Sequence, residues 1–366
     1  MKGIGRDLPL PPFYEPANAE RWCYAPDPLN LFRRAEAWRS EHKVAPSGSD
    51  RFRIHLLLVD VQKDFCFPQG ALFVGGRSGR GAVEDSRRIA EFIHLNAARI
   101  TKITTTLDTH LVYQIFFPWF FVDEDQRPLE PHTLVRMEDE GRSLLNTDAS
   151  GKVLHPRVRP NPAVAWWVCG GDYEWLCKQT EYYCSELSKG GRYTLYLWPP
   201  HCLLGTEGHG IVGVVQEASM FHSFLRGAQS WFEIKGNDPL TENYSVLRPE
   251  VLLKWDGSPL AQENRGFVET LLKADAVLIA GQAASHCVKS TAEDLLRAIS
   301  ERDGRLAGRI YLLTDCMSSV VVPDGKGGIA ADFTHQAEEA QGRFAAAGMH
   351  LVKSTDPVES WPGIDP

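Results

Sequence analysis

Two short apolar segments set the strongest limit on what this chain can fold into. Residues 54–60 contain LLLVD, and residues 276–281 read AVLIAG. Their apolar residues are continuous rather than alternating, which is typical of strands buried on both faces of a parallel sheet. Because longer amphipathic segments separate such runs, we predict an α/β fold, a three-layer α/β/α sandwich with a mostly parallel Rossmann-like sheet. The predicted strands are residues 54–60, 100–107, 193–197, 231–234, 276–280, 310–314 and 350–352, and the predicted helices are residues 82–98, 208–225, 261–273, 286–300 and 334–347.

Two segments interrupt this alternation. Residues 1–50 begin with a proline-rich stretch and then carry a helix-like stretch at 29–43, which predicts an N-terminal arm that packs on the core. Residues 111–190 lie where an ordinary crossover would be much shorter, and they are too aromatic for a flexible linker. We therefore expect one domain over residues 51–366, with a folded, aromatic-rich insertion at 111–190 near the carboxyl ends of the strands.

Charge and cysteine usage argue against several classes of protein. Lys and Arg number 39 against 47 Asp and Glu, a net charge of -8, so we expect neither nucleic acid nor an anionic membrane as a partner. The most apolar segment, residues 113–122, is too short to span a bilayer, and prolines interrupt the N-terminus before a signal peptide could form. The eight cysteines include no C-x-x-C pair, which favours a reducing compartment and a cytoplasmic location.

Reactive side chains follow five of the predicted strands. In doubly wound sheets, ligands bind at the carboxyl ends of the strands. We therefore expect these side chains to meet at one edge of the sheet. The segments are Asp60-Val61-Gln62-Lys63-Asp64-Phe65, Asp108-Thr109-His110, Trp198-Pro199-Pro200-His201-Cys202, Lys235-Gly236 and Gly281-Gln282-Ala283-Ala284-Ser285-His286-Cys287.

This set of segments resembles the motifs of the nicotinamidase and isochorismatase-like cysteine hydrolases. The matching motifs are D-x-Q-x-D-F, D-x-H, W-P-x-H-C, K-G and G-x-A-x-x-x-C-V-x-x-T, in the order of the family. The resemblance implies the isochorismatase-like hydrolase fold and a small-molecule amide substrate, with nicotinamide as the default. Related enzymes often form a homo-oligomer, which is an analogy. Residues 1–50 and 111–190 are not covered, and the aromatic insertion beside D-x-H could adapt the pocket to a bulkier amide.

Cys287 is the candidate nucleophile. A thiol reacts as the thiolate, whose pKa is lowered at a helix N-terminus and beside a cation, and Lys235 can supply that cation. Asp60 can accept the thiol proton and later donate it to departing ammonia. The resemblance assigns the same three residues, and it implies that the backbone N–H groups of Ala283 and Cys287 hold an oxyanion beside a cis Gln282–Ala283 bond. Taken singly, each residue also fits an ordinary structural role.

Asp108, His110 and His201 are the candidate metal ligands. Residues i and i+2 of an extended segment point to the same side, so D-x-H presents a carboxylate and an imidazole together. Three protein ligands leave positions open for water and substrate, and the resemblance gives these three the metal. We expect one divalent metal ion: zinc first, with iron, manganese or magnesium as alternatives. Phe65 and Trp198 match positions that flank a planar substrate ring in the family, with core packing as the alternative.

The residues thus predict a metal-dependent cysteine amidohydrolase that forms a thioester and releases ammonia. Three alternatives remain. Residues 208–213 fit G-x-G-x-x-G with Glu233 twenty residues further on, as in an NAD-dependent dehydrogenase, although the motif does not follow its strand directly. An isochorismatase-type hydrolase would require neither metal nor thiol. A catalytically inactive binding protein on the same fold would retain the site without turnover.

Overall fold

A six-stranded sheet in which all strands are parallel forms the centre of the molecule. The computed structural model describes residues 7–138, 143–190 and 193–364. The strand order is β13-β10-β9-β1-β2-β8, and each neighbouring pair is parallel. The strands β1 and β9 are buried along their whole length, as their continuous apolar sequences predict. The strands are β1 (Ile54–Val59), β2 (Ile100–Asp108), β8 (Trp231–Lys235), β9 (Ala276–Gly281), β10 (Ile310–Leu313) and β13 (His350–Val352).

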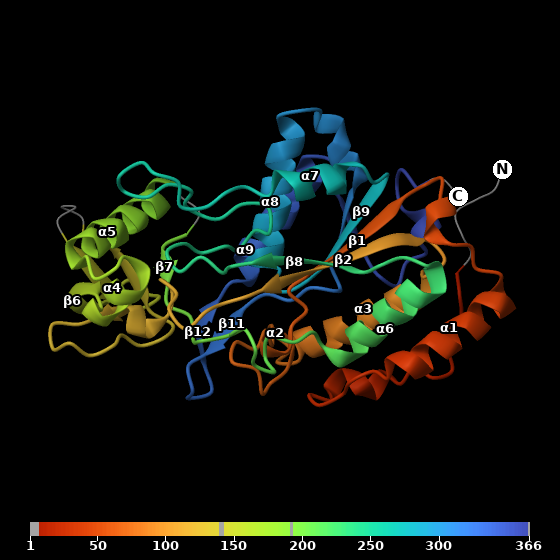
Figure 1. Cartoon of the computed structure of the whole chain (residues 1–366), viewed down its shortest axis with the longest axis horizontal. Coiled ribbons are helices and arrows are strands. Elements are labelled where there is room, and N and C mark those ends of the chain that lie inside the picture. Colours follow the sequence, from red (N-terminus) through yellow and green to blue (C-terminus); the bar gives the residue numbers. More distant parts are fainter. Residues whose placement is uncertain (1–6, 139–142, 191–192, 365–366) are drawn as a thin grey trace.

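Helices cover both faces of this sheet (Figure 1). The helices α3 (Gly81–Leu95) and α6 (Gly213–Arg226) lie on one face, and α7 (Arg265–Leu272), α8 (Cys287–Ser300) and α9 (Thr334–Ala346) lie on the other. The predicted three-layer α/β/α sandwich is therefore confirmed. The helix predicted at 208–225 begins only at Gly213, because residues 208–212 form a loop that hydrogen-bonds to residues 61–64, the segment after β1.

The N-terminal residues pack on the outside of this sandwich. The helix α1 (Pro28–His42) begins with Pro28, after the Asp27 side chain accepts hydrogen bonds from two backbone N–H groups of the first turn. It lies against α6, where the two helices share a small apolar core. An ion pair between Arg226 of α6 and Asp50 adds a second anchor.

A second sheet, entirely antiparallel, lies between β2 and α6 in the sequence. Its strand order is β3-β6-β5-β4-β7, and two helices, α4 (Pro162–Val168) and α5 (Tyr173–Gly190), accompany it at one end of the molecule. The prediction that residues 193–197 belong to the central sheet is wrong, because β7 pairs with β4 instead. A two-residue strand carries no sequence signal for its partner. The strands are β3 (Phe121–Val122), β4 (Leu134–Met137), β5 (Leu144–Thr147), β6 (Val153–Pro160) and β7 (Leu195–Tyr196).

The remaining elements are short. A hairpin of β11 (Val321–Pro323) and β12 (Ile329–Asp332) precedes α9, and α2 (Lys63–Cys66) follows β1. No helix within the described ranges has both the length and the apolar character needed to cross a bilayer. The 3-10 helices are η1 (Pro16–Glu20), η2 (Ser47–Ser49), η3 (Pro118–Phe120), η4 (Gly304–Arg309) and η5 (Val358–Ser360).

Candidate active site

Four neighbouring strands bring the three candidate catalytic residues and the candidate metal ligand Asp108 to one edge of the central sheet. Asp60 directly follows β1, Asp108 ends β2, Lys235 ends β8 and Cys287 begins α8 just after β9. Because these strands are parallel and adjacent in the order β9-β1-β2-β8, their carboxyl ends lie together. The register pairs Asp108 with Lys235 directly.

The ammonium group of Lys235 is the centre of the cluster. Its Nζ lies 2.9 Å from Asp60 Oδ2, 2.9 Å from Asp108 Oδ1 and 3.6 Å from Cys287 Sγ. All four side chains are buried. The structure thus brings together the sulfur, the ammonium and the carboxylate that the sequence placed far apart.

Thr106 of β2 orients Asp60, a contact that the sequence analysis missed. The Asp60 N–H donates to Thr106 Oγ1 at 2.9 Å, and the same hydroxyl donates to Asp60 Oδ1. Asp60 has a φ of 46°, in the left-handed region. Its other oxygen, Oδ2, accepts no hydrogen bond from the described residues and meets Lys235 only as an ion pair. Thr106 therefore engages Oδ1 and leaves Oδ2 facing Lys235.

The thiol of Cys287 has a pKa raised well above its usual value, contrary to the expectation of a lowered one. Burial is the largest cause; Lys235 lowers the pKa, but the charges of Asp60 and Asp108 raise it. Burial also raises the pKa of Asp60 despite the nearby ammonium. Burial would lower the pKa of Lys235, yet the Asp108 and Asp60 carboxylates hold it well above its usual value. The raised pKa favours a neutral Cys287 thiol beside the Asp60 carboxyl group.

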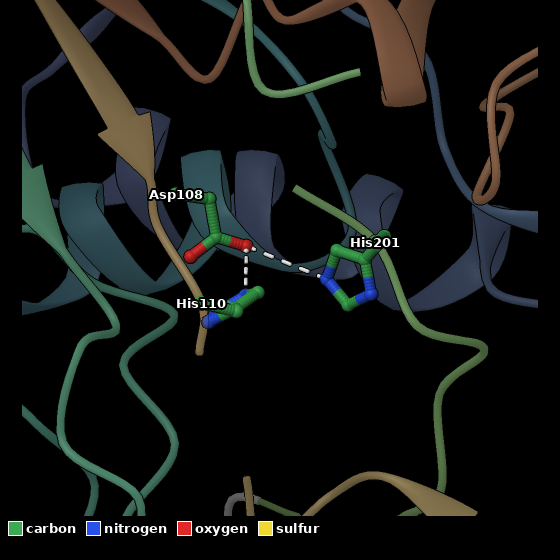
Figure 2. A group of neighbouring side chains, drawn as sticks. All are labelled: Asp108, His110 and His201. Carbon is green, nitrogen blue, oxygen red and sulfur yellow. Dashed lines mark hydrogen bonds and ion pairs between the residues drawn. The ribbon is translucent and has the colours of Figure 1, made fainter. Parts of the chain in front are cut away.

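Asp108, His110 and His201 converge on one point (Figure 2). Asp108 Oδ2 lies 2.9 Å from His110 Nε2 and 3.5 Å from His201 Nε2, and one ligand atom from each residue lies within 4.8 Å of the others. The Nδ1 atoms face the carbonyl oxygens of Gly236 at 2.9 Å and Pro199 at 2.7 Å, respectively. Since a carbonyl only accepts, both Nδ1 atoms carry a hydrogen, and in the neutral imidazole each Nε2 presents a lone pair. Acceptor atoms this close to a carboxylate suit a cation between them, so the three residues fit a divalent metal.

The motif residues around this point hold it in place. Gln62 accepts from the Asp108 N–H at 2.8 Å and donates to the Asp108 carbonyl at 2.9 Å, which ties the end of β1 to the end of β2. Asp64 accepts from the Cys202 N–H at 2.7 Å and so fixes the loop that carries His201. At Gly236, where φ is 83°, a Cβ would lie 2.7 Å from His110 Cε1, which explains the glycine of K-G.

The turn between β9 and α8 presents two free N–H groups. The Gln282–Ala283 bond is cis, as the resemblance implied. Within the described ranges, neither the Ala283 N–H nor the Cys287 N–H donates a hydrogen bond. Both residues line the same pocket as Lys235. These two donors are available to an oxygen atom beside the thiol.

Phe65 and Trp198 line the pocket above Cys287. Its wall also includes residues that no motif indicated, among them Phe116, Glu242 and Tyr244. Trp198 Nε1 donates to Tyr244 Oη at 2.8 Å, and that hydroxyl donates to Glu242 Oε1 at 2.7 Å. Burial raises the pKa of Glu242 to about 8.

The glycines of residues 208–213 serve packing. A side chain at Gly208 would collide with the Asp64 carboxylate, and one at Gly213 would collide with the Tyr24 backbone. Glu233 accepts hydrogen bonds from Trp231 and Asn264. These contacts account for the motif without a dinucleotide.

Comparison with known proteins finds similarity only among solved structures. No protein-family model and no curated protein sequence matches the chain. A yeast nicotinamidase bound to the inhibitor nicotinaldehyde is 17% identical, with 82% of this chain and 99% of that chain covered and a TM-score of 0.48. An Acinetobacter nicotinamidase/pyrazinamidase is 17% identical, with 84% and 99% covered and a TM-score of 0.46. A Pyrococcus horikoshii pyrazinamidase in complex with zinc is 18% identical, with 82% and 99% covered and a TM-score of 0.42. By their printed titles, these three proteins are nicotinamidases or pyrazinamidases.

Proposed function

We propose that the protein is a metal-dependent cysteine amidohydrolase that converts a small carboxamide to its acid and ammonia. One observation carries the proposal: Lys235 Nζ lies 2.9 Å from Asp60 and 3.6 Å from the sulfur of Cys287, at the edge of a pocket. A nucleophile, a proton acceptor and a fixed cation at these distances are the groups that acyl transfer through sulfur requires.

The proposed reaction begins with transfer of the Cys287 proton to Asp60 Oδ2. The sulfur attacks the amide carbon, and the carbonyl oxygen becomes an oxyanion facing the N–H groups of Ala283 and Cys287. Asp60 then gives its proton to the amide nitrogen; the C–N bond breaks, ammonia leaves and a thioester remains. In the second half, Asp60 takes a proton from water, whose oxygen attacks the thioester. The proton returns to the sulfur as the acid leaves. Throughout, Lys235 offsets the negative charge of the cluster.

Asp108, His110 and His201 would hold one divalent metal ion. Two imidazole nitrogens and one carboxylate with open positions favour zinc, with iron or manganese as alternatives and magnesium, which prefers oxygen ligands, least suited. When bound, the ion would position and polarise a substrate group at the pocket wall. The eight cysteines are free in the structure, which supports a reducing compartment, and we propose the cytoplasm.

The pocket beside Cys287 is largely apolar. Phe65, Trp198 and Phe116 line it, and we propose that Phe65 and Trp198 contact a flat substrate ring, as the resemblance implies. Nicotinamide is therefore the first substrate to test. A bulkier aromatic amide is the variant that the insertion could add.

Ammonia release across a panel of amides tests the proposal. The panel runs from nicotinamide and pyrazinamide to bulkier aromatic and aliphatic amides. Cys287→Ala should abolish release, whereas Cys184→Ala, which removes another buried thiol, should not change it. Full activity in Cys287→Ala would point to isochorismatase-type chemistry. No release from any amide together with tight NAD binding would favour the dehydrogenase, and absence of both would favour a binding protein.

A further inference from the structure

Neighbouring segments hold the turn that presents the Ala283 and Cys287 N–H groups. The Gln282 N–H donates to the Val59 carbonyl of β1 at 2.7 Å, and the Ala284 N–H donates to the Ser318 carbonyl at 2.8 Å. The N–H of Ala283 lies between these two tethered residues. Its direction therefore depends on where β1 and the segment around Ser318 lie.

The side chain of Gln282 connects this turn to α3. Its Nε2 donates to Asp85 Oδ2 at 3.0 Å, and its Oε1 accepts from the Ser318 N–H at 3.3 Å. Ser318 Oγ donates to the same Asp85 Oδ2 at 2.6 Å. Gln282 and Asp85 are each 1% exposed, so water does not compete for these bonds. Asp85 Oδ2 thus binds both Gln282 of the turn and Ser318 of the neighbouring segment.

Asp85 is itself rigidly placed. Arg88, one helical turn further along α3, donates to Asp85 Oδ1 at 2.8 Å. At the start of α3, a Cβ on Gly81 would lie 2.8 Å from Ser318 Cβ, so the helix packs directly on the serine. The carboxylate therefore transmits the position of the helix to the turn.

We propose that Asp85 is a positioning residue for the oxyanion-binding N–H groups, acting through Gln282 and Ser318. The inference rests on the proposed function. Negative charge develops on the substrate oxygen only when sulfur attacks the carbonyl, so displaced N–H groups weaken the transition state more than the bound amide. Alkylation of a thiol at a saturated carbon develops no oxyanion and does not depend on these donors.

Two variants test the role of Asp85 by different routes. Asp85→Asn replaces an acceptor with a group that also donates, and Gln282→Met keeps the side-chain shape without the hydrogen bonds. Each should lower kcat by about tenfold to a hundredfold and change KM by less than about threefold. An aldehyde analogue of the best amide, which adds to Cys287 to form an oxyanion, should bind weaker by about the same factor as kcat falls. The rate of Cys287 alkylation by iodoacetamide should stay within about twofold of wild type.

The control is Ser86→Ala, which removes a buried hydrogen bond within α3 that does not reach the turn. It should leave kcat and aldehyde binding unchanged. The kcat of the double variant Asp85→Asn/Gln282→Met should be no lower than that of the slower single variant, because both changes break the same connection between Asp85 and Gln282. If Asp85→Asn does not fold, Gln282→Met carries the test.

Two failures can be told apart. A wild-type protein that releases no ammonia from any amide contradicts the proposed function. If the wild type is active and the folded Gln282→Met variant keeps the wild-type kcat and aldehyde affinity, the proposed role of Asp85 is wrong. The proposed function is not affected by that result. Equal loss of kcat and of alkylation rate would also overturn it, because that pattern indicates general disruption of the site.

Discussion

Thr106 and Asp60 hold each other in a reciprocal pair: the hydroxyl accepts from the backbone N–H of Asp60 and donates to its carboxylate. The two residues are 46 positions apart and come from neighbouring strands. The pair leaves Oδ2 of Asp60 directed to Lys235. The orientation of the proposed proton acceptor therefore depends on Thr106, which is not among the residues that line the pocket.

Replacing Thr106 with valine should slow the reaction. The variant keeps the side-chain shape but removes a hydrogen bond to a charged group, worth about 1.5 to 3 kcal/mol, so kcat should fall by at least about tenfold. Steady-state ammonia release measures the effect. Thr105→Val is the matched control, because this buried neighbour points to the other face of β2. Equal rates for wild type and Thr106→Val would show that Asp60 needs no such support.

Removal of a metal ligand and removal of the thiol should have different effects on metal content. His201→Ala removes one of three ligands and should lower the bound metal by at least about tenfold under matched loading, whereas Cys287→Ala should leave it unchanged. Elemental analysis of the purified proteins measures both. His350→Ala, at the opposite edge of the central sheet, is the control. Metal loss in Cys287→Ala would place the sulfur among the ligands, and full occupancy in His201→Ala would remove this histidine from them.

Gly236, which has no side chain to bind a metal, should also control metal content. In Gly236→Ala, a new Cβ would lie 2.7 Å from His110 Cε1 and 2.8 Å from Asp108 Oδ1, so both ligands must shift. Gly227→Ala is a matched control because Gly227 also has a positive φ, 61°, and no atom within 4 Å of its Cβ position. Both variants incur the backbone strain, about 1 kcal/mol, but only Gly236→Ala should lose metal. Equal metal content in the two would show that the ligands tolerate the displacement.

Glu242 should make stability depend on pH. Burial raises its pKa from 4.5 to about 8, so the folded protein holds this proton more tightly than the unfolded chain. Its contribution is fully present below the unfolded pKa and is lost as pH rises toward about 8, by at most about 5 kcal/mol. Between pH 5 and 8, the free energy of unfolding of the wild type, measured in urea, should therefore fall relative to that of Glu242→Gln. Glu174→Gln, at an exposed position of α5, should show no such difference. Parallel stability curves for wild type and Glu242→Gln would contradict the raised pKa.

The sequence predicted the central sheet well because burial on both faces leaves a direct pattern. The run LLLVD predicts a strand with reactive residues at its carboxyl end, and β1 with Asp60 is that strand. Residues 193–197 were assigned to the wrong sheet because strand pairing is decided by contacts that a local pattern does not contain. The sequence predicts a lowered pKa for Cys287 from the helix N-terminus and Lys235, whereas burial and the Asp60 and Asp108 carboxylates raise it.

Other parts of the site had no local signal at all. Asp85 and Gln282 are 197 residues apart, and a buried Asp in a helix looks like many surface acids in a sequence. The same is true of Thr106, one threonine in a run of three. Such residues are recognisable only when the chain is folded, since their partners define them.

Two of the three proposed metal ligands precede the second sheet, and the third follows it. His110 leaves β2 just before the antiparallel region, and His201 arrives just after β7, where the His110 N–H also donates to the Cys202 carbonyl at 3.0 Å. A bound ion would therefore close a long loop and clamp both ends of the inserted layer, which links metal affinity to correct folding of that layer. A substitution that disrupts a distant strand of this layer would then lower the affinity for the ion.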